Sequence, residues 1–122
     1  MGEAFVPDWA APANVKALQT TRNGGVSSLP WASFNLGDHV GDDPAAVAAN
    51  RQALRAALPD EPCWLRQVHG IVAVDADRRP KTVEADAAFA RRPGTVCVVM
   101  TADCLPVLLC DRRGSEIGRA HV

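Results

Sequence analysis

The chain has 122 residues, 48% of them hydrophobic, and a formal net charge of −1. This length suits one domain, and the interspersed charges argue against nucleic acid or an acidic membrane surface as a partner. No apolar run approaches the roughly 18 residues that span a bilayer, and the first residues lack the basic and apolar stretches of a secretory signal. We therefore expect a cytoplasmic protein.

Residues 1–14 are rich in Pro and Ala and are predicted to be irregular, and residues 15–21 (VKALQTT) are predicted to form a strand. Residues 22–43 contain many Gly, Ser and Asn residues and form a long loop. Loops of this length inside a domain are usually functional or disordered. Because this one carries several apolar side chains, we expect it to be ordered and functional.

Asp43 and Pro44 open the one clear helix, which Pro59 ends. Asp at the N-cap can accept a hydrogen bond from a free backbone N–H, and Pro at the first helical position loses no bond. We interpret this helix as scaffold.

Short strands are predicted after the helix, at residues 63–68, 71–74, 85–90, 96–100 and 106–110. The last two are continuously apolar, which is typical of strands buried on both faces, so helices should cover this sheet. One helix is too few, and the sheet therefore looks incompletely covered.

The four cysteines are expected to be reduced thiols in a cytoplasmic protein, and the lack of a CxxC pair argues against a structural zinc ribbon. Two of them lie inside apolar runs and are predicted to be buried and inert. The positions are Cys63, Cys97, Cys104 and Cys110, of which Cys97 and Cys110 are the two in apolar runs.

A polar step, Thr101 to Leu105 (TADCL), separates the two most apolar strands and places Asp103 and Cys104 at a strand end. An Asp and a thiolate there are costly to bury without a partner, which a divalent metal would supply. His69, in LRQVHGI, also follows a strand. The alternatives are a turn with an incidental thiol and a structural histidine, since two ligands are fewer than zinc normally takes.

Three successive blocks carry a family resemblance: TTRNGGVSSLPWASFNLGDHVGDDPAAVAANRQAL, WLRQVHG and EADAAFARRPGTVCVVMTADCLPVLLCD. They resemble the polyphenol oxidase or laccase-domain family, whose members are also described as purine nucleoside phosphorylases and peptidoglycan editing factors. The resemblance runs from about Val15 to Asp111. It implies an α/β fold of mixed β-sheet layers covered by helices, an α/β/β/α arrangement, of which residues 1–122 are the N-terminal portion of a single unit.

The resemblance implies that His69, Cys104 and His121 hold the metal, Zn²⁺ with Cu²⁺ as the alternative. The GWRG that follows the third histidine in the family is missing here. The ending IGRAHV equals the translation of a common sequencing adapter, so residues 116–122 are expected to be a non-native tail that follows native sequence ending near Ser115. The alternative is a natural chain end.

Other matched positions imply roles in substrate binding. Arg22, beside a glycine turn, is predicted to bind phosphate and to take part in catalysis with His69 and Cys104. Asn35 and His39 are predicted to line the pocket. Loop structure is the alternative for all three.

The expected function is a metal-dependent purine nucleoside phosphorylase that acts on adenosine, inosine and S-methyl-5'-thioadenosine with phosphate, and that also deaminates adenosine through metal-activated water. Without a metal, the Cys104 thiolate would serve as nucleophile. Copper-dependent polyphenol oxidation ranks lower because three histidines are too few for several coppers. Editing of a peptidoglycan precursor and a chain without activity are further alternatives. Asp86 and Asp103 are candidates to orient a metal ligand. The oligomeric state is left open.

Overall fold

Two units divide the chain in the computed structural model, which describes residues 2–81, 83–102 and 104–121. The loop–helix unit consists of Met1–Trp9 and Lys16–Leu58, and the sheet unit consists of Ala10–Val15 and Pro59–Val122. Within the described residues, no helix is long and apolar enough to cross a membrane.

The loop–helix unit is built around helix α1 (Pro44–Arg55) and a two-stranded sheet. The Asp43 side chain accepts a hydrogen bond from the Ala45 N–H at 3.0 Å, so the predicted start of the helix is confirmed. The helix ends at Arg55 with Ala56 as its cap, earlier than the end predicted at Pro59. The strand predicted at residues 15–21 is shorter, because only β2 (Gln19–Thr20) pairs. Its antiparallel partner is β1 (Ala4–Phe5), in the lead-in predicted to be irregular.

In the loop at residues 22–43, as predicted, an apolar side chain is tied down, since Phe34 is buried, and a buried amide also holds the loop to α1. Val26 and Leu29 are 64% and 80% exposed, whereas Asn50 is 1% exposed. The Asn50 carboxamide oxygen accepts a hydrogen bond from the Val26 N–H at 3.0 Å. Its nitrogen donates to the Ser27 hydroxyl and to two loop carbonyls, those of residues 33 and 35.

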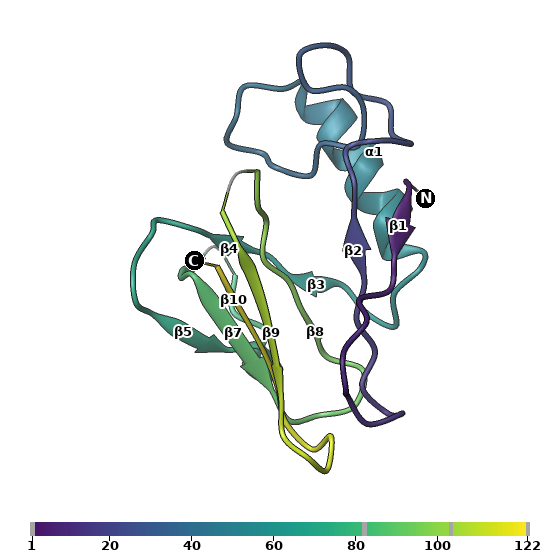
Figure 1. Ribbon diagram of the computed structural model, residues 1–122. Coiled ribbons are helices and arrows are strands. Elements are labelled where there is room, and N and C mark those ends of the chain that lie inside the picture. The colour runs from purple at the N-terminus through teal and green to yellow at the C-terminus, as the bar shows by residue number, and fades with distance from the viewer. Residues whose placement is uncertain (1, 82, 103, 122) are drawn as a thin grey trace. The chain divides into compact units, whose positions relative to one another are not determined.

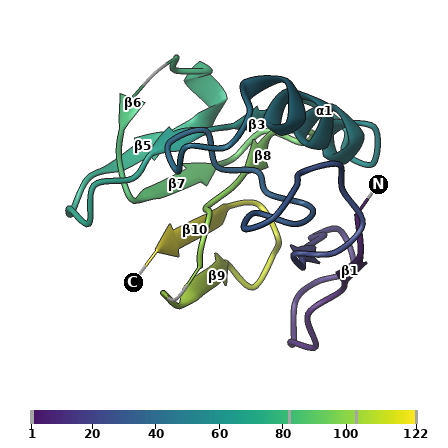
Figure 2. The same cartoon turned by 90° about the horizontal axis from the view of Figure 1, so that it is seen from above.

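The sheet unit contains a four-stranded mixed sheet in the order β5-β7-β10-β9, with β5 and β7 parallel and the other pairs antiparallel. Figures 1 and 2 show these strands side by side. Two parallel pairs, β3 with β8 and β4 with β6, complete the unit. The elements are β3 (Pro62–Cys63), β4 (Leu65–Arg66), β5 (Ala73–Asp75), the 3₁₀ helix η1 (Ala76–Arg78), β6 (Val83–Glu84), β7 (Ala87–Ala90), β8 (Val96–Cys97), β9 (Pro106–Cys110) and β10 (Ile117–His121).

The core of the sheet unit is made of small side chains. Alternate residues of β7 are buried, as expected for a strand with one face toward a core. Small residues let neighbouring strands and η1 pack closely on this face. The buried cluster comprises Cys63, Leu65, Ala76, Ala85, Ala88, Ala90, Cys97 and Val99.

The prediction that β9 is buried on both faces is wrong. β9 lies at an edge of the four-stranded sheet, Leu109 is 56% exposed, and Cys110 is only partly buried, although Cys97 is buried as predicted. Among the described residues of the sheet unit there is no α-helix that covers this strand. An apolar run therefore predicted the strand but not its surroundings.

The prediction of a non-native tail concerns the residues of β10, which pairs with both β7 and β9. This pairing does not test the origin of the tail, because strand ladders form through backbone groups that every non-proline residue carries.

Candidate metal centre

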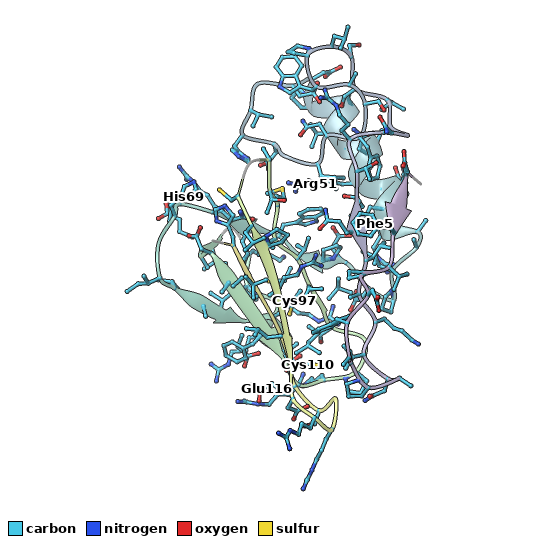
Figure 3. All side chains as sticks on the ribbon, viewed as in Figure 1. Phe5, Arg51, His69, Cys97, Cys110 and Glu116 are labelled. Carbon is cyan, nitrogen blue, oxygen red and sulfur yellow. The ribbon has the colours of Figure 1, made fainter. Side chains whose placement is uncertain are left out.

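A left-handed turn carries the first candidate ligand. His69 lies between β4 and β5 and has φ of 57°, a conformation that residues with a side chain rarely adopt. Figure 3 shows His69 at one end of the sheet and Glu116 at the opposite end. The turn therefore places an exposed imidazole at a sheet edge, where the sequence pattern predicted it.

The Asp86 carboxylate fixes this turn by accepting hydrogen bonds from its backbone. Its Oδ1 accepts hydrogen bonds from the N–H groups of Val68 and Gly70 at 3.1 and 2.9 Å, and its Oδ2 accepts one from His69 at 2.9 Å. Burial alone would raise the pKa of this carboxyl group. The backbone hydrogen bonds, led by the one from Gly70, outweigh burial and lower the pKa to about 2. The group is therefore ionised at neutral pH.

The second candidate ligand, His121, lies at the end of β10 and touches the same carboxylate. Its Nδ1 is 2.8 Å from the Asp86 Oδ2. An ionised carboxylate can only accept a hydrogen bond, so Nδ1 carries the proton and Nε2 is left to bind a metal. A backbone bond from the His121 N–H to the Asp86 carbonyl, at 2.9 Å, fixes the strand at this point.

Gln67 brings the segment with the third candidate ligand to the same place. Its side-chain nitrogen donates to the Met100 carbonyl, and its side-chain oxygen accepts from the Met100 N–H, each at 2.7 Å. This reciprocal pair joins the chain just before His69 to the chain just before Cys104. This role of Gln67 had no sign in the sequence, because its partner Met100 lies 33 residues away along the chain.

His69, Cys104 and His121 form the cluster that results. One nitrogen of each imidazole and the Cys104 sulfur lie within 4.8 Å of one another. The two imidazole rings have centroids 4.7 Å apart. Ligand atoms of a tetrahedral zinc site are about 3.3–3.6 Å apart for bonds of about 2.0–2.3 Å, a spacing that lies inside the 4.8 Å limit of this cluster. Two imidazoles and a thiolate suit zinc and leave a fourth position open.

The other predicted site residues lie in the loop–helix unit, where the side chains of Arg22 and Asn35 bond to the backbone of the loop. The Arg22 guanidinium donates to the carbonyls of Ala32 at 2.9 Å and Pro30 at 3.3 Å. Asn35 exchanges hydrogen bonds with the backbone of Gly37. The His39 side chain is 65% exposed. Their roles toward a substrate stay predictions, and Asp103 lies outside the described residues.

Comparisons with known proteins point to one family. The sequence profile of the multi-copper polyphenol oxidoreductase laccase family matches residues 16–122. The chain is 51% identical to a purine nucleoside phosphorylase of Pseudomonas aeruginosa and 50% identical to the purine nucleoside phosphorylase YfiH of Escherichia coli, with 99% of the chain matched in each case. These matches cover 50% and 51% of the relatives, so the chain spans about half of their length.

Solved structures agree on the fold. A crystal structure of a Neisseria meningitidis protein, 50% identical, superposes with a TM-score of 0.90 over 98% of this chain and 50% of its own. YlmD from Geobacillus stearothermophilus, 29% identical, gives a TM-score of 0.80 over 90% of this chain and 46% of its own. The mixed sheets with few helices are thus the fold of these neighbours over the matched half.

Proposed function

Because this chain belongs to the multi-copper polyphenol oxidoreductase laccase family, we propose that His69, Cys104 and His121 form the metal centre of a purine nucleoside phosphorylase. The observation that carries the proposal is the convergence of two imidazoles and a thiol at one end of a sheet. The names of the Pseudomonas and Escherichia relatives support the reaction class.

Zinc is the proposed cation, because one thiolate and two imidazoles match its preferred ligands and geometry. When bound, it would supply a Lewis acid at an exposed sheet end. The residues of this chain supply the rest. His69 offers its ring from an exposed turn, Cys104 offers its sulfur as thiolate, and Asp86 keeps the proton of His121 on Nδ1.

The proposed substrates are adenosine, inosine and S-methyl-5'-thioadenosine. In phosphorolysis a phosphate oxygen forms a bond to the anomeric carbon of the ribose, and the bond from that carbon to the purine nitrogen breaks, with the electron pair leaving on the base. Arg22 is proposed to bind the phosphate, since a guanidinium matches two of its oxygens. Deamination of adenosine is proposed as a second activity.

The family description favours one alternative, copper-dependent oxidation of phenols. Oxygen reduction by several coppers needs many imidazole ligands, but the sequence has three histidines. Within the described residues, only the His69–Cys104–His121 cluster brings together three candidate ligands. Phosphorolysis therefore ranks above oxidation.

The test combines metal content with turnover. The purified chain is expected to bind one zinc, and to convert adenosine and phosphate into adenine and ribose 1-phosphate, detected by chromatography. His69→Ala and Cys104→Ala should lose both properties. His39→Ala and Cys110→Ala are the matched controls for metal content, because both side chains lie outside the cluster. Several coppers with phenol oxidation, or turnover that survives loss of the cluster, would contradict the proposal.

A further inference from the structure

We propose that Asp86 is a positioning residue, whose carboxylate sets the left-handed turn at His69 and so directs the imidazole toward Cys104 and His121. The inference rests on the proposed metal centre and goes beyond it, because it names the group that gives the ligands their arrangement.

The turn needs such a group because of its backbone conformation. His69 has a positive φ without being glycine, a conformation in which the side chain crowds the backbone. Of the described residues other than glycine, only Arg79 shares it. Such a conformation persists where the surroundings fix it.

Three consecutive N–H groups, those of Val68, His69 and Gly70, point at one carboxylate. Successive N–H groups around a left-handed residue form a concave anion-binding site. Here the anion is built into the chain, because Asp86 is 3% exposed and lies within hydrogen-bond distance of all three donors. The carboxylate thus provides what the turn requires, because both of its oxygens accept hydrogen bonds and the turn offers N–H donors.

The same carboxylate reaches the second imidazole. Oδ2 accepts from the His69 N–H and lies 2.8 Å from the His121 Nδ1, so one oxygen links the backbone of one candidate ligand to the ring of another. Carboxylates that fix the ring of a metal-binding histidine raise metal affinity, and their loss typically weakens it.

The backbone of Asp86 has separate partners, which makes a side-chain test informative. Its N–H donates to the Val72 carbonyl at 3.1 Å, and its carbonyl accepts from the His121 N–H at 2.9 Å. Asp86→Asn keeps these bonds, the shape of the side chain and one acceptor oxygen. It places an NH₂ group against N–H donors and removes the charge.

The experiment is a competition titration of the 122-residue chain with Zn²⁺, repeated with Co²⁺ and followed by its visible and near-ultraviolet spectrum. We expect Asp86→Asn to bind both metals about 10- to 100-fold more weakly. The Cys104–cobalt charge-transfer band should return at saturation, because the thiolate is intact. Cys104→Ala should lack that band at every concentration.

Asp77→Asn is the matched control. Asp77 also accepts hydrogen bonds from two consecutive N–H groups, those of Arg91 and Arg92, in the same unit, but it is not part of the cluster. The Asp77→Asn variant should bind Zn²⁺ and Co²⁺ with the affinity of the unsubstituted chain. Equal affinities of Asp86→Asn and the unsubstituted chain would overturn the inference alone, whereas an unsubstituted chain that binds neither metal would overturn the metal centre as well.

Hydrogen exchange of the unsubstituted chain is a second measurement, and it does not depend on whether a variant folds. The residues Val68, His69 and Gly70 lie in an exposed turn, and among the residues that the structure describes their amides donate to the Asp86 carboxylate. We expect slow exchange at all three, as at amides of the central strands. Exchange at the rate of an open loop would contradict the role of Asp86.

Discussion

Two irregular segments of this chain each bond to a buried polar side chain, and the two side chains differ in kind. Asn50 holds the loop at residues 22–43, and Asp86 holds the turn at His69. The loop presents both N–H and carbonyl groups, so an amide, which donates and accepts, satisfies it. The turn presents only N–H groups, so a carboxylate satisfies it and also places a negative charge beside two candidate metal ligands.

The largest expected effect is a loss of stability when the neutral amide of Asn50 is replaced by a carboxylate. Asn50→Asp keeps the acceptor for the Val26 N–H but turns a donor of three hydrogen bonds into an acceptor that faces other acceptors. Because each unsatisfied buried group costs about 1–3 kcal/mol, we expect a loss of about 3 kcal/mol or more in the free energy of unfolding of the loop–helix unit. Urea denaturation measures it.

Gln52→Ala, on the exposed face of the same helix, is the control for Asn50→Asp and should change stability by a few tenths of a kcal/mol. A stable Asn50→Asp variant would show that the loop does not depend on this amide.

Metal addition tests the other region, in which the Asp86 carboxylate lies beside the candidate metal ligands. A cation that binds only the folded sheet unit should raise its free energy of unfolding by about 2.7 kcal/mol at a free zinc concentration of 100 times Kd. Hydrogen exchange should show the added protection around His69 and β10, and a chelator should remove it. Equal protection in Cys104→Ala would contradict metal binding at this cluster.

Gln67→Ala sharpens the comparison, because Gln67, like Asn50, is an amide that both donates and accepts, yet it lies beside the cluster. Loss of the two bonds to Met100 should destabilise the sheet unit by about 1–2 kcal/mol and weaken zinc binding, since the segment before Cys104 is released. Gln67→Glu keeps an acceptor for the Met100 N–H but no donor for the Met100 carbonyl. Its stability and its zinc affinity should lie between those of Gln67→Ala and those of the unsubstituted chain. Urea denaturation and zinc titration give both quantities.

What the sequence predicted follows from how local each signal is. The Asp43–Pro44 start of α1 was predictable because the cap and its acceptor lie within one turn. His69 and Cys104 were predictable as strand-end residues of chemical interest. The role of Asn50 was not, since its partners lie 15 to 24 residues away and are mostly backbone groups that carry no sequence signature.

The two-residue strands β1 and β6 were not predicted for a related reason, since two residues show no periodicity.

The non-native tail at residues 116–122 stays a prediction. Sequencing the gene from genomic DNA tests it, because a continuation that lacks IGRAHV supports the adapter origin and a stop codon directly after Val122 contradicts it.

The smallest expected effect concerns acid, to which a carboxylate responds and an amide does not. Asp77 lies away from the cluster and accepts hydrogen bonds from backbone N–H groups, chiefly that of Arg91, which lower its pKa below the ordinary value. A carboxyl group whose pKa is lower in the folded state contributes stability above its unfolded pKa of about 3.9 and loses it as the pH falls through the folded pKa. Asp77→Asn should therefore lose less stability than the unsubstituted chain between about pH 5 and pH 2. Urea midpoints across this range measure the difference, and parallel curves would show that the backbone bonds to Asp77 add no pH-dependent stability.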